Sequence, residues 1–352
     1  MTELWIAGAG MPGRTATFAA RTEQEGWDGL ALVDSQNLAV DPYVHLGIAA
    51  SATERLKLGT GVTNPLTRHP AVTAAAIATV HIESGGRAVL GIGRGDSSLA
   101  HLGLAPASPA AFERYLSRLQ RYLRGEEVTF DPTNDGAGLA RPASSLGMAD
   151  APEGSRIHWI AGASDRKVPV DVAATGPRVI AIAASLADRI TFAVGSDAER
   201  LNWAMDEARR AAGAGCPPLG AYVPVVVHAD RRIARELIGG AVASFARFSV
   251  MHGTVSGPAN EVERSALSAV HERYDMHHHF THGSPQSRDL PPELVDSFGI
   301  AGPPSYCVDR LIQMIDLGLD KLVLLGGGIG MNREAARDSR RMLAEQVLPK
   351  LR

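Results

Sequence analysis

Two strand-to-turn segments, about twenty residues apart, constrain the fold of this chain more than any other feature. The first is Gly59-Thr-Gly-Val-Thr-Asn-Pro-Leu-Thr-Arg-His-Pro70, and the second is Arg87-Ala-Val-Leu-Gly-Ile-Gly-Arg-Gly-Asp-Ser97. A helix-like segment at 71–82 separates them, so the whole predicts a β-α-β unit with parallel strands. Ligands bind at the carboxyl ends of strands in parallel α/β folds, and we therefore expect both turns to face the active site.

Alternating strand and helix patterns continue beyond this unit and predict a complete (β/α)8 TIM barrel. Each expected strand is followed by a helix-like segment, and the strands begin near residues 3, 28, 55, 87, 168, 189, 220 and 320. Eight such units are typical of this fold. A doubly wound open sheet is the alternative, and the eighth strand argues against it.

The length of the chain leaves room for insertions into the barrel. Its 352 residues exceed the roughly 250 of a typical barrel. Two stretches rich in Gly, Pro and polar residues, at about 125–166 and 253–290, interrupt the alternation, and only 157–160 in the first has a strand-like pattern. We interpret both as insertions in a single domain spanning 1–352, and we expect them to decide the substrate.

The composition limits the classes of partner. Basic and acidic residues nearly balance, at 35 and 38, and no aromatic-basic stripe is present, so we expect no nucleic-acid binding. The N-terminus carries no basic segment followed by an apolar core, and no apolar run reaches the roughly 20 residues of a membrane span. We therefore expect a cytoplasmic protein that acts on a small molecule.

A histidine-rich segment, Asp275-Met-His-His-His-Phe-Thr-His282, invites interpretation as a metal site. Consecutive histidines point in different directions, and no carboxylate pair or cysteine lies at ligand spacing. We expect no metal here and interpret the segment as a solvated or substrate-covering loop. Cys216 and Cys307 lie far apart without a CxxC pattern, which favours reduced thiols.

Polar residues and glycines follow several expected strands. Asp34 follows the second strand, where its carboxylate can accept a hydrogen bond from a ring nitrogen of a bound heterocycle, form a loop ion pair or cap a helix. Gly61 at a strand end indicates either a bulge with unusual peptide geometry, able to back a planar ring, or a simple turn. His69 precedes Pro70, so it is a helix-entry residue or an acid/base group.

Two glycine-containing turns suggest contacts with a phosphate-bearing ligand. The segment 91–97 matches a G-x-G-x-x-G pattern only loosely, but its backbone N–H groups can face a ligand at the strand end. Ala173-Ala-Thr-Gly-Pro-Arg178 ends a strand and opens a helix, whose first-turn N–H groups favour a phosphate. Thr175 can add a hydroxyl group and Arg178 a positive charge. A plain strand-to-helix turn is the alternative.

Together these motifs resemble the luciferase-like monooxygenase superfamily. The matching segments are 61–70, 85–93 and 173–178, with Ile300-Ala-Gly-Pro-Pro304 near the end of the chain. Within the superfamily, the chain is most similar to methylenetetrahydromethanopterin reductases and their actinobacterial relatives, over about residues 1–349. The resemblance implies an insertion-bearing barrel that usually dimerises and binds the deazaflavin coenzyme F420 or a reduced flavin across the strand ends.

The resemblance also implies roles for the matching residues. Asp34 would contact the ring edge, and Gly61 and Val62 would form a non-proline cis peptide that backs the ring. The other cofactor-binding residues would be Asn64, Gly93, Arg94, Gly95 and Asp96 around the ring and ribityl chain, and Thr175, Gly176, Pro177 and Arg178 at the phosphate. Ser35 follows Asp34 where some relatives carry histidine, so a histidine acid there is unsupported.

These inferences predict an oxidoreductase that uses coenzyme F420 to transfer a hydride to or from a C=C, C=N or C=O group. Any proton would come from Asp96, His69 or water, and Asp34, Asp96 and His69 are the candidate catalytic residues. The alternative is a monooxygenase that uses FMNH2, oxygen and a partner reductase. A non-catalytic flavin-binding protein, or a barrel hydrolase using Asp34 and Asp96, is a remoter alternative. The oligoglutamate tail of coenzyme F420 would need a basic exit groove, for which the candidates are Arg14, Arg68, Arg94, Arg166, Lys167 and Arg178.

Overall fold

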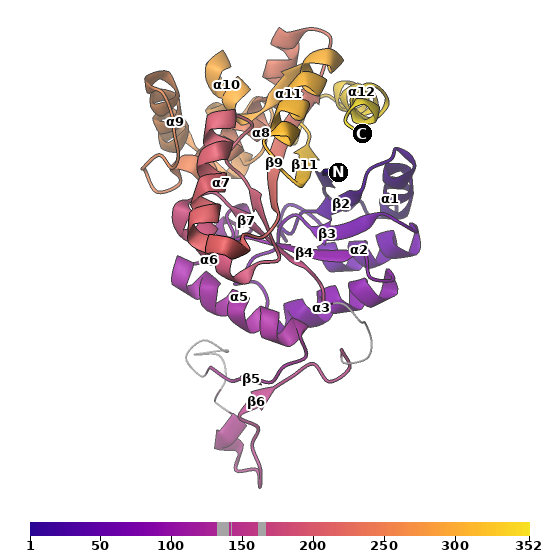
Figure 1. Cartoon of the computed structure of the whole chain (residues 1–352), viewed down its shortest axis with the longest axis vertical. Coiled ribbons are helices and arrows are strands. Elements are labelled where there is room, and N and C mark those ends of the chain that lie inside the picture. The colour runs from indigo at the N-terminus through magenta and orange to yellow at the C-terminus, as the bar shows by residue number, and fades with distance from the viewer. Residues whose placement is uncertain (132–140, 142, 161–166) are drawn as a thin grey trace.

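The computed structural model describes residues 1–131, 141, 143–160 and 167–352, and its centre is a closed barrel of eight parallel strands (Figure 1). Around the barrel each strand pairs with its two neighbours in the ring. The pairings of β8 with β9 and of β11 with β1 complete the closure. In ring order the strands are β1 (Glu3–Gly8), β2 (Gly29–Leu32), β3 (Lys57–Thr60), β4 (Ala88–Ile92), β7 (Val170–Ala174), β8 (Arg189–Phe192), β9 (Leu219–Val227) and β11 (Lys321–Leu325). The predicted fold class and all eight predicted strands are thereby confirmed.

Helices cover the outside of the barrel, and several begin as the sequence predicts. Asp41 accepts hydrogen bonds from the backbone N–H groups of Tyr43 and Val44, and Ser108 accepts one from Ala111. In both cases proline follows the cap, at the first helical position. The long helices that follow barrel strands are α1 (Thr15–Gln24), α2 (Pro42–Ser51), α3 (Pro70–Glu83), α5 (Pro109–Leu123), α6 (Pro177–Leu186), α7 (Ala198–Ala212), α8 (Arg231–Val250) and α12 (Arg333–Met342).

The barrel interior holds a buried ion pair at its amino-terminal end. Lys321, the first residue of β11, places Nζ 2.9 Å from Oδ2 of Asp171 on β7. The hydroxyl group of Thr191 donates to the other carboxylate oxygen over 2.7 Å, and the Lys321 ammonium group lies 3.7 Å from the Trp5 ring centroid. Gly220 makes room for this pair, because an added Cβ would lie 3.0 Å from that of Lys321.

The described residues of the first insertion lie outside the barrel. They contain a two-stranded antiparallel ladder of β5 (Val128–Thr129) and β6 (Gly154–Ser155). The strand predicted at 157–160 is wrong: these residues form a turn, closed by a bond from Ile160 N–H to the Ile157 carbonyl. The apolar pattern arises because Ile157 and Ile160 pack against the core from this turn, whereas Trp159 is exposed.

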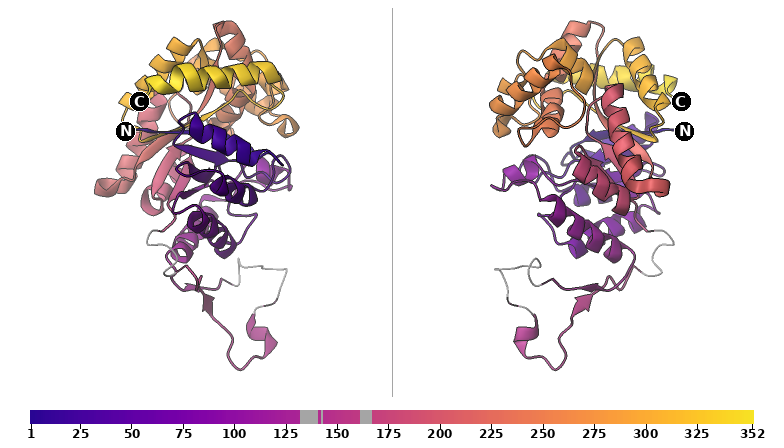
Figure 2. Two further views of the ribbon diagram at one scale, coloured as in Figure 1. Left: turned by 90° about the vertical axis from the view of Figure 1, so that its right-hand side faces the viewer. Right: turned by 60° about the vertical axis from the view of Figure 1, so that its left-hand side comes forward.

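The second insertion contains α9 (Glu261–Arg273), which agrees with the helix that the sequence predicts at 260–273. The sequence pattern did not separate the two short elements that follow the insertion, α10 (Pro292–Phe298) and β10 (Ile300–Gly302). Strand β10 extends the sheet by pairing with the end of β9 and leads into α11 (Pro304–Asp316). Figures 1 and 2 place this region and the β5–β6 ladder at opposite ends of the molecule. The assignment of residues 1–352 to a single domain stays a prediction.

Among the described residues, no helix combines the length and apolar character that crossing a membrane requires.

Candidate active site

The mouth of the barrel has a floor of small residues where four strands end. An added Cβ on Gly61 would lie 2.8 Å from Cβ of Ala31, and one on Gly93 would lie 3.3 Å from Cγ2 of Val62 and 3.7 Å from Cβ of Ala173. The Gly61–Val62 peptide bond is cis, as the family resemblance implied. Larger side chains would fill this cradle, so the floor suits a flat ring laid across the strand ends.

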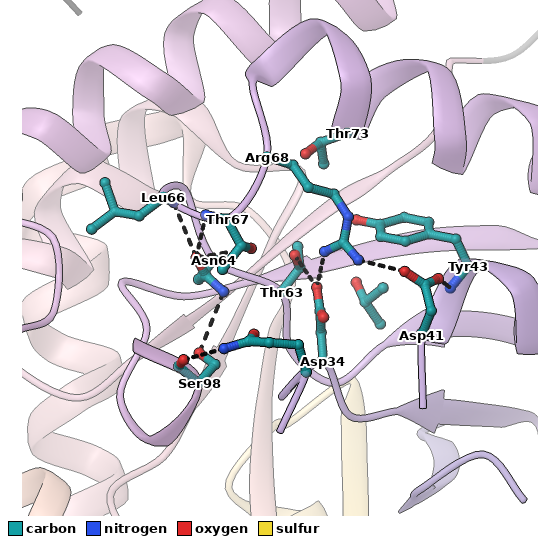
Figure 3. Close-up of polar contacts among 12 residues, drawn as sticks. Asp34, Asp41, Tyr43, Thr63, Asn64, Leu66, Thr67, Arg68, Thr73 and Ser98 are labelled. Atoms are coloured by element: carbon teal, nitrogen blue, oxygen red, sulfur yellow. Dashed lines mark hydrogen bonds and ion pairs between the residues drawn. The ribbon is translucent and has the colours of Figure 1, made fainter. Parts of the chain in front are cut away.

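Asp34 lies beside this floor at the end of β2 and is held by two neighbours (Figure 3). Its Oδ2 atom accepts hydrogen bonds from Thr63 Oγ1 and from Arg68 Nη1, both at 2.6 Å. Arg68 also pairs with Asp41 at 2.7 Å and lies 4.8 Å above the Tyr43 ring. Burial alone would lower the pKa of Arg68, but the charge of Asp34, together with smaller contributions from Tyr43 and Asp41, outweighs burial and raises that pKa. Asp34 therefore belongs to a fixed ionic network.

Asn64 shapes the turn after β3 (Figure 3). Its side-chain oxygen accepts hydrogen bonds from the backbone N–H groups of Leu66 and Thr67, at 3.0 and 3.1 Å. Its amide nitrogen donates to Ser98 Oγ over 3.3 Å, which ties this turn to the segment after β4. The described bonds thus use both ends of a side chain that is 1% exposed. Its predicted direct contact with the cofactor stays a prediction.

The turn after β4 brings Asp96 into a second polar cluster. Gly95 has a φ of 86°, which favours glycine, and Arg94 donates to the Ala107 carbonyl and so braces the loop. Asp96 forms an ion pair through Oδ1 with Arg247 of α8. Its Oδ2 atom is buried and has no hydrogen-bond partner among the described residues.

The second insertion completes this cluster. His279 Nδ1 lies 3.9 Å from Asp96 Oδ2 and 2.7 Å from the Tyr274 hydroxyl group. The Arg247 guanidinium group lies 4.6 Å from the Tyr274 ring centroid. Burial lowers the pKa of His279 to about 4, although the charge of Asp96 acts in the opposite direction. The imidazole ring is therefore neutral at physiological pH.

A phosphate site fits the start of α6. Gly176 caps this helix without a side-chain hydrogen bond, Pro177 occupies its first position, and Arg178 is exposed. Thr175 precedes the cap, and its hydroxyl group donates to the Ala193 carbonyl over 3.3 Å. The N–H groups and dipole of such a helix start favour an anion. Ser256 lies above it, with Oγ 3.8 Å from an added Cβ on Gly176.

A buried arginine that the sequence reasoning missed fixes the segment around Ser256. Arg200 is 2% exposed and donates to the carbonyls of Val194, Ser256 and Pro258 and to Ser249 Oγ. Burial lowers its pKa to about 10, so it stays charged. No sequence motif marks Arg200, because three of these four partners are backbone carbonyl groups, two of them in the distant second insertion.

His69 and Lys167 lie outside the candidate cofactor site. Nδ1 of His69 accepts a hydrogen bond from Ala71 N–H, so this residue caps α3, as the helix-entry alternative predicts. Lys167 pairs with Asp188 beside the first residue of β7. Because that is the amino end of the strand, the prediction that Lys167 lines a groove at the carboxyl ends is wrong. Arg166 lies outside the described residues.

The histidine-rich segment is held by its own acidic residue. His278 Nδ1 lies 2.6 Å from Asp275 Oδ2, and His279 turns toward Tyr274 instead. In the part of the chain that the structure describes, no three His, Cys, Asp or Glu side chains form a metal-binding group. The two insertions differ in position: the second reaches Asp96, whereas the first departs after α5 and rejoins at the amino end of β7. Among the described residues, the second insertion is the one that contacts Asp96, and the expectation that the insertions decide the substrate stays a prediction.

The fold and site define a class of protein: a (β/α)8 barrel whose mouth suits a flat, phosphate-bearing ring beside a cluster of ionisable side chains. The family model described as luciferase-like monooxygenase matches residues 5–321, and the chain belongs to this family.

Relatives within the family cover almost the whole chain. A 5,10-methylenetetrahydromethanopterin reductase of Archaeoglobus fulgidus is 29% identical over 346 residues, with 95% of each chain covered. An F420-dependent glucose-6-phosphate dehydrogenase of Microbacterium testaceum is 27% identical over 365 residues, covering 97% of this chain and 94% of that one. The structure of coenzyme F420-dependent tetrahydromethanopterin reductase from Methanopyrus kandleri aligns with a TM-score of 0.70 at 22% identity, covering 100% and 99%, and shows the same fold.

Proposed function

We propose that this protein is a coenzyme F420-dependent oxidoreductase that transfers a hydride between the deazaflavin and a small organic substrate. The observation that carries the proposal is the floor formed by Ala31, Gly61, Gly93 and Ala173, which a larger side chain would fill. The F420-dependent relatives, which match nearly the full length, support this cofactor. When bound, the deazaflavin supplies the hydride, and the protein supplies orientation and a proton.

The residues around the floor suggest how the cofactor is held. Both described hydrogen bonds of Asp34 end on Oδ2, so Oδ1 is the oxygen available to a ring N–H group. Thr175, Gly176, Pro177 and Arg178 hold the phosphate at the start of α6. Gly93, Arg94 and Gly95 shape the loop beside the ring, with Arg94 acting through its bond to Ala107.

Asp96 is the proton partner in this proposal. In the direction that oxidises the substrate, the Asp96 carboxylate, paired with Arg247, would take the proton from the substrate O–H or N–H bond while the neighbouring C–H bond gives up a hydride and the C=O or C=N bond forms. In the reducing direction the same bonds would break and form in reverse, and Asp96 would pass on a proton taken from water. His69 is assigned to the cap of α3 and not to this step.

One observation favours the alternative, a monooxygenase that uses FMNH2 and oxygen with a partner reductase. Of the basic residues expected to guide the tail of coenzyme F420, Arg68 is paired with Asp34, Arg94 with a carbonyl group, and Lys167 with Asp188. FMN ends at the phosphate and needs no such path.

A titration of the protein with coenzyme F420 and with FMN, followed by tryptophan fluorescence, distinguishes the F420-dependent oxidoreductase from the monooxygenase. Trp203 packs against Gly257, next to the proposed phosphate site, and is a suitable reporter. We expect micromolar or tighter binding of coenzyme F420 and weaker binding of FMN. Ala173→Leu should abolish binding because it fills the floor, whereas Ala181→Leu on the exposed side of α6 should not. Tighter binding of FMN would replace the proposal with the monooxygenase.

We further infer that the enzyme is a cytoplasmic homodimer that binds neither nucleic acid nor membranes. The two packed helices α2 and α3 present Val44, Ile48 and Val72 to solvent, with 62%, 41% and 55% of each residue exposed. Helices that are apolar on all sides are normally buried, and a second copy of the chain covers both at once through a self-complementary contact.

Val44→Glu is expected to weaken the dimer at least about tenfold, because the interface would have to bury an unpaired carboxylate. Sedimentation velocity over a concentration series measures this change. Val262→Glu is the control, since Val262 is similarly exposed, at 53%, on the distant α9. A wild-type monomer, or equal association of both variants, would contradict the dimer.

A further inference from the structure

The segment from Tyr274 to His282 crosses the barrel mouth and is anchored on its far side. Ile329 follows β11, and its N–H group donates to the Phe280 carbonyl over 2.7 Å. The His282 N–H group donates to the Ile329 carbonyl over 2.8 Å. These backbone bonds fix the path of the segment above the strand ends and hold Tyr274 and His279 beside Asp96.

Arg247 is held between this segment and the loop after β4. Its Nη1 atom pairs with Asp96 Oδ1, and its guanidinium group lies over the Tyr274 ring at 4.6 Å. Both partners of the ion pair are mostly buried, with 17% and 13% of their side chains exposed. A guanidinium group fixed in this way occupies one carboxylate oxygen and leaves the other in a defined direction.

A second set of contacts positions His279 against that other oxygen. The Phe280 N–H group donates to Ser244 Oγ over 3.0 Å, Ser244 Oγ lies 3.0 Å from the Tyr274 hydroxyl group, and that hydroxyl group lies 2.7 Å from His279 Nδ1. The ring therefore has a fixed orientation, with Nδ1 3.9 Å from Asp96 Oδ2. This distance is too long for a direct hydrogen bond, and Oδ2 has no other described partner.

We propose that Arg247, Tyr274 and His279 are positioning residues that hold the Asp96 carboxyl group with Oδ1 occupied and Oδ2 directed to the reacting substrate. The inference rests on the proposed function, because it is Asp96 that exchanges the proton there. It assigns a purpose to the second insertion, which supplies two of the three residues. Ser35, and not a histidine, follows Asp34 in this chain. His279 from the second insertion instead brings an imidazole group close to the Asp96 carboxyl group.

The charges that surround His279 give the proposal a measurable signature. Asp96 and His101 face the ring from the β4–α5 connection, Arg247 faces it from α8, and Tyr274 lies on its own segment. Burial lowers the pKa of His279 to about 4, Asp96 raises it, and Arg247 and His101 lower it further. Removing the negative charge of Asp96 must therefore lower the pKa of His279, whereas removing the positive charge of Arg247 must raise it.

The test is an NMR titration of the full-length protein with isotope-labelled histidine, with His279→Gln to assign the ring signal. We expect the His279 midpoint to lie near pH 4 in the wild type. Asp96→Asn should move it down and Arg247→Met should move it up, while Arg247→Lys should keep it close to the wild-type value. Asp275→Asn is the matched control, because Asp275 pairs with His278 and its neutralisation should leave the His279 midpoint unchanged.

Midpoints of His279 that do not respond to Asp96→Asn or to Arg247→Met would overturn the proposal. A second measurement adds oxidised coenzyme F420 at neutral pH and follows the same signals. The His279 signal should shift while the His278 signal stays in place. If the charge couplings are found but coenzyme F420 shifts no histidine signal and does not bind, the proposed function fails and the positioning of Asp96 stands. If coenzyme F420 binds without the couplings, the positioning fails alone.

Discussion

Replacing Asp96 by asparagine is expected to slow hydride transfer by a factor of about 10²–10⁴, the usual contribution of a positioned general acid or base. The amide group keeps the size of the side chain and can still accept a hydrogen bond from Arg247, so the loop after β4 should keep its structure. It has no carboxyl proton to exchange with the substrate. The measurement is the single-turnover oxidation of enzyme-bound reduced coenzyme F420 by a carbonyl or imine acceptor.

Two controls separate loss of the proton partner from loss of the site. The affinity for oxidised coenzyme F420 should change little in Asp96→Asn, because the floor and the phosphate site are untouched. Asp275→Asn makes the same chemical change in the second insertion, at a carboxylate that pairs with His278, and should keep the wild-type rate. An Asp96→Asn variant that turns over at the wild-type rate would contradict the assignment and point to water as the proton source.

The barrel could be predicted because its determinants are local. Each strand is a short apolar stretch that ends in a glycine or a polar turn, and several long helices begin at a side-chain cap such as Asp41 or Ser108. The short β10 could not be separated from its neighbours, because three residues that gain order only by pairing with Val225, Val226 and Val227 carry no periodic pattern. The same limit explains the error at 157–160, where apolar residues pack from a turn.

The site divides in the same way between local and distant determinants. Gly61, Gly93 and the start of α6 lie in recognisable turns at strand ends, so their positions followed from the motifs. Arg200 and Arg247 could not be found, because each lies inside an ordinary helix and gains much of its role from distant partners. Ser249 lies 49 residues from Arg200, and Asp96 lies 151 residues from Arg247. Charge and burial together, not spacing, would identify such residues.

Replacing Lys321 by methionine is expected to lower the free energy of unfolding by about 3–5 kcal/mol, the cost of removing one partner of a buried ion pair. The side chains of Lys321 and Asp171 are only 4% and 2% exposed. Without the ammonium group, the Asp171 carboxylate would keep only the hydrogen bond from Thr191 in the barrel interior. Burial already lowers the pKa of Lys321, and Asp171 opposes that effect, so the charged lysine depends on its partner.

Urea-induced unfolding followed by circular dichroism measures the loss, and two further variants make it specific. Lys57→Met is the matched control: Lys57 also begins a barrel strand and pairs with Glu3 at 2.8 Å, but it is 45% exposed, so the expected loss is within about 1 kcal/mol. Adding Asp171→Asn to Lys321→Met should recover much of the stability, because a neutral amide group can keep the Thr191 bond without burying a charge. A Lys321→Met variant as stable as Lys57→Met, or a double variant less stable than the single one, would show that the pair does not hold the amino-terminal end of the barrel together.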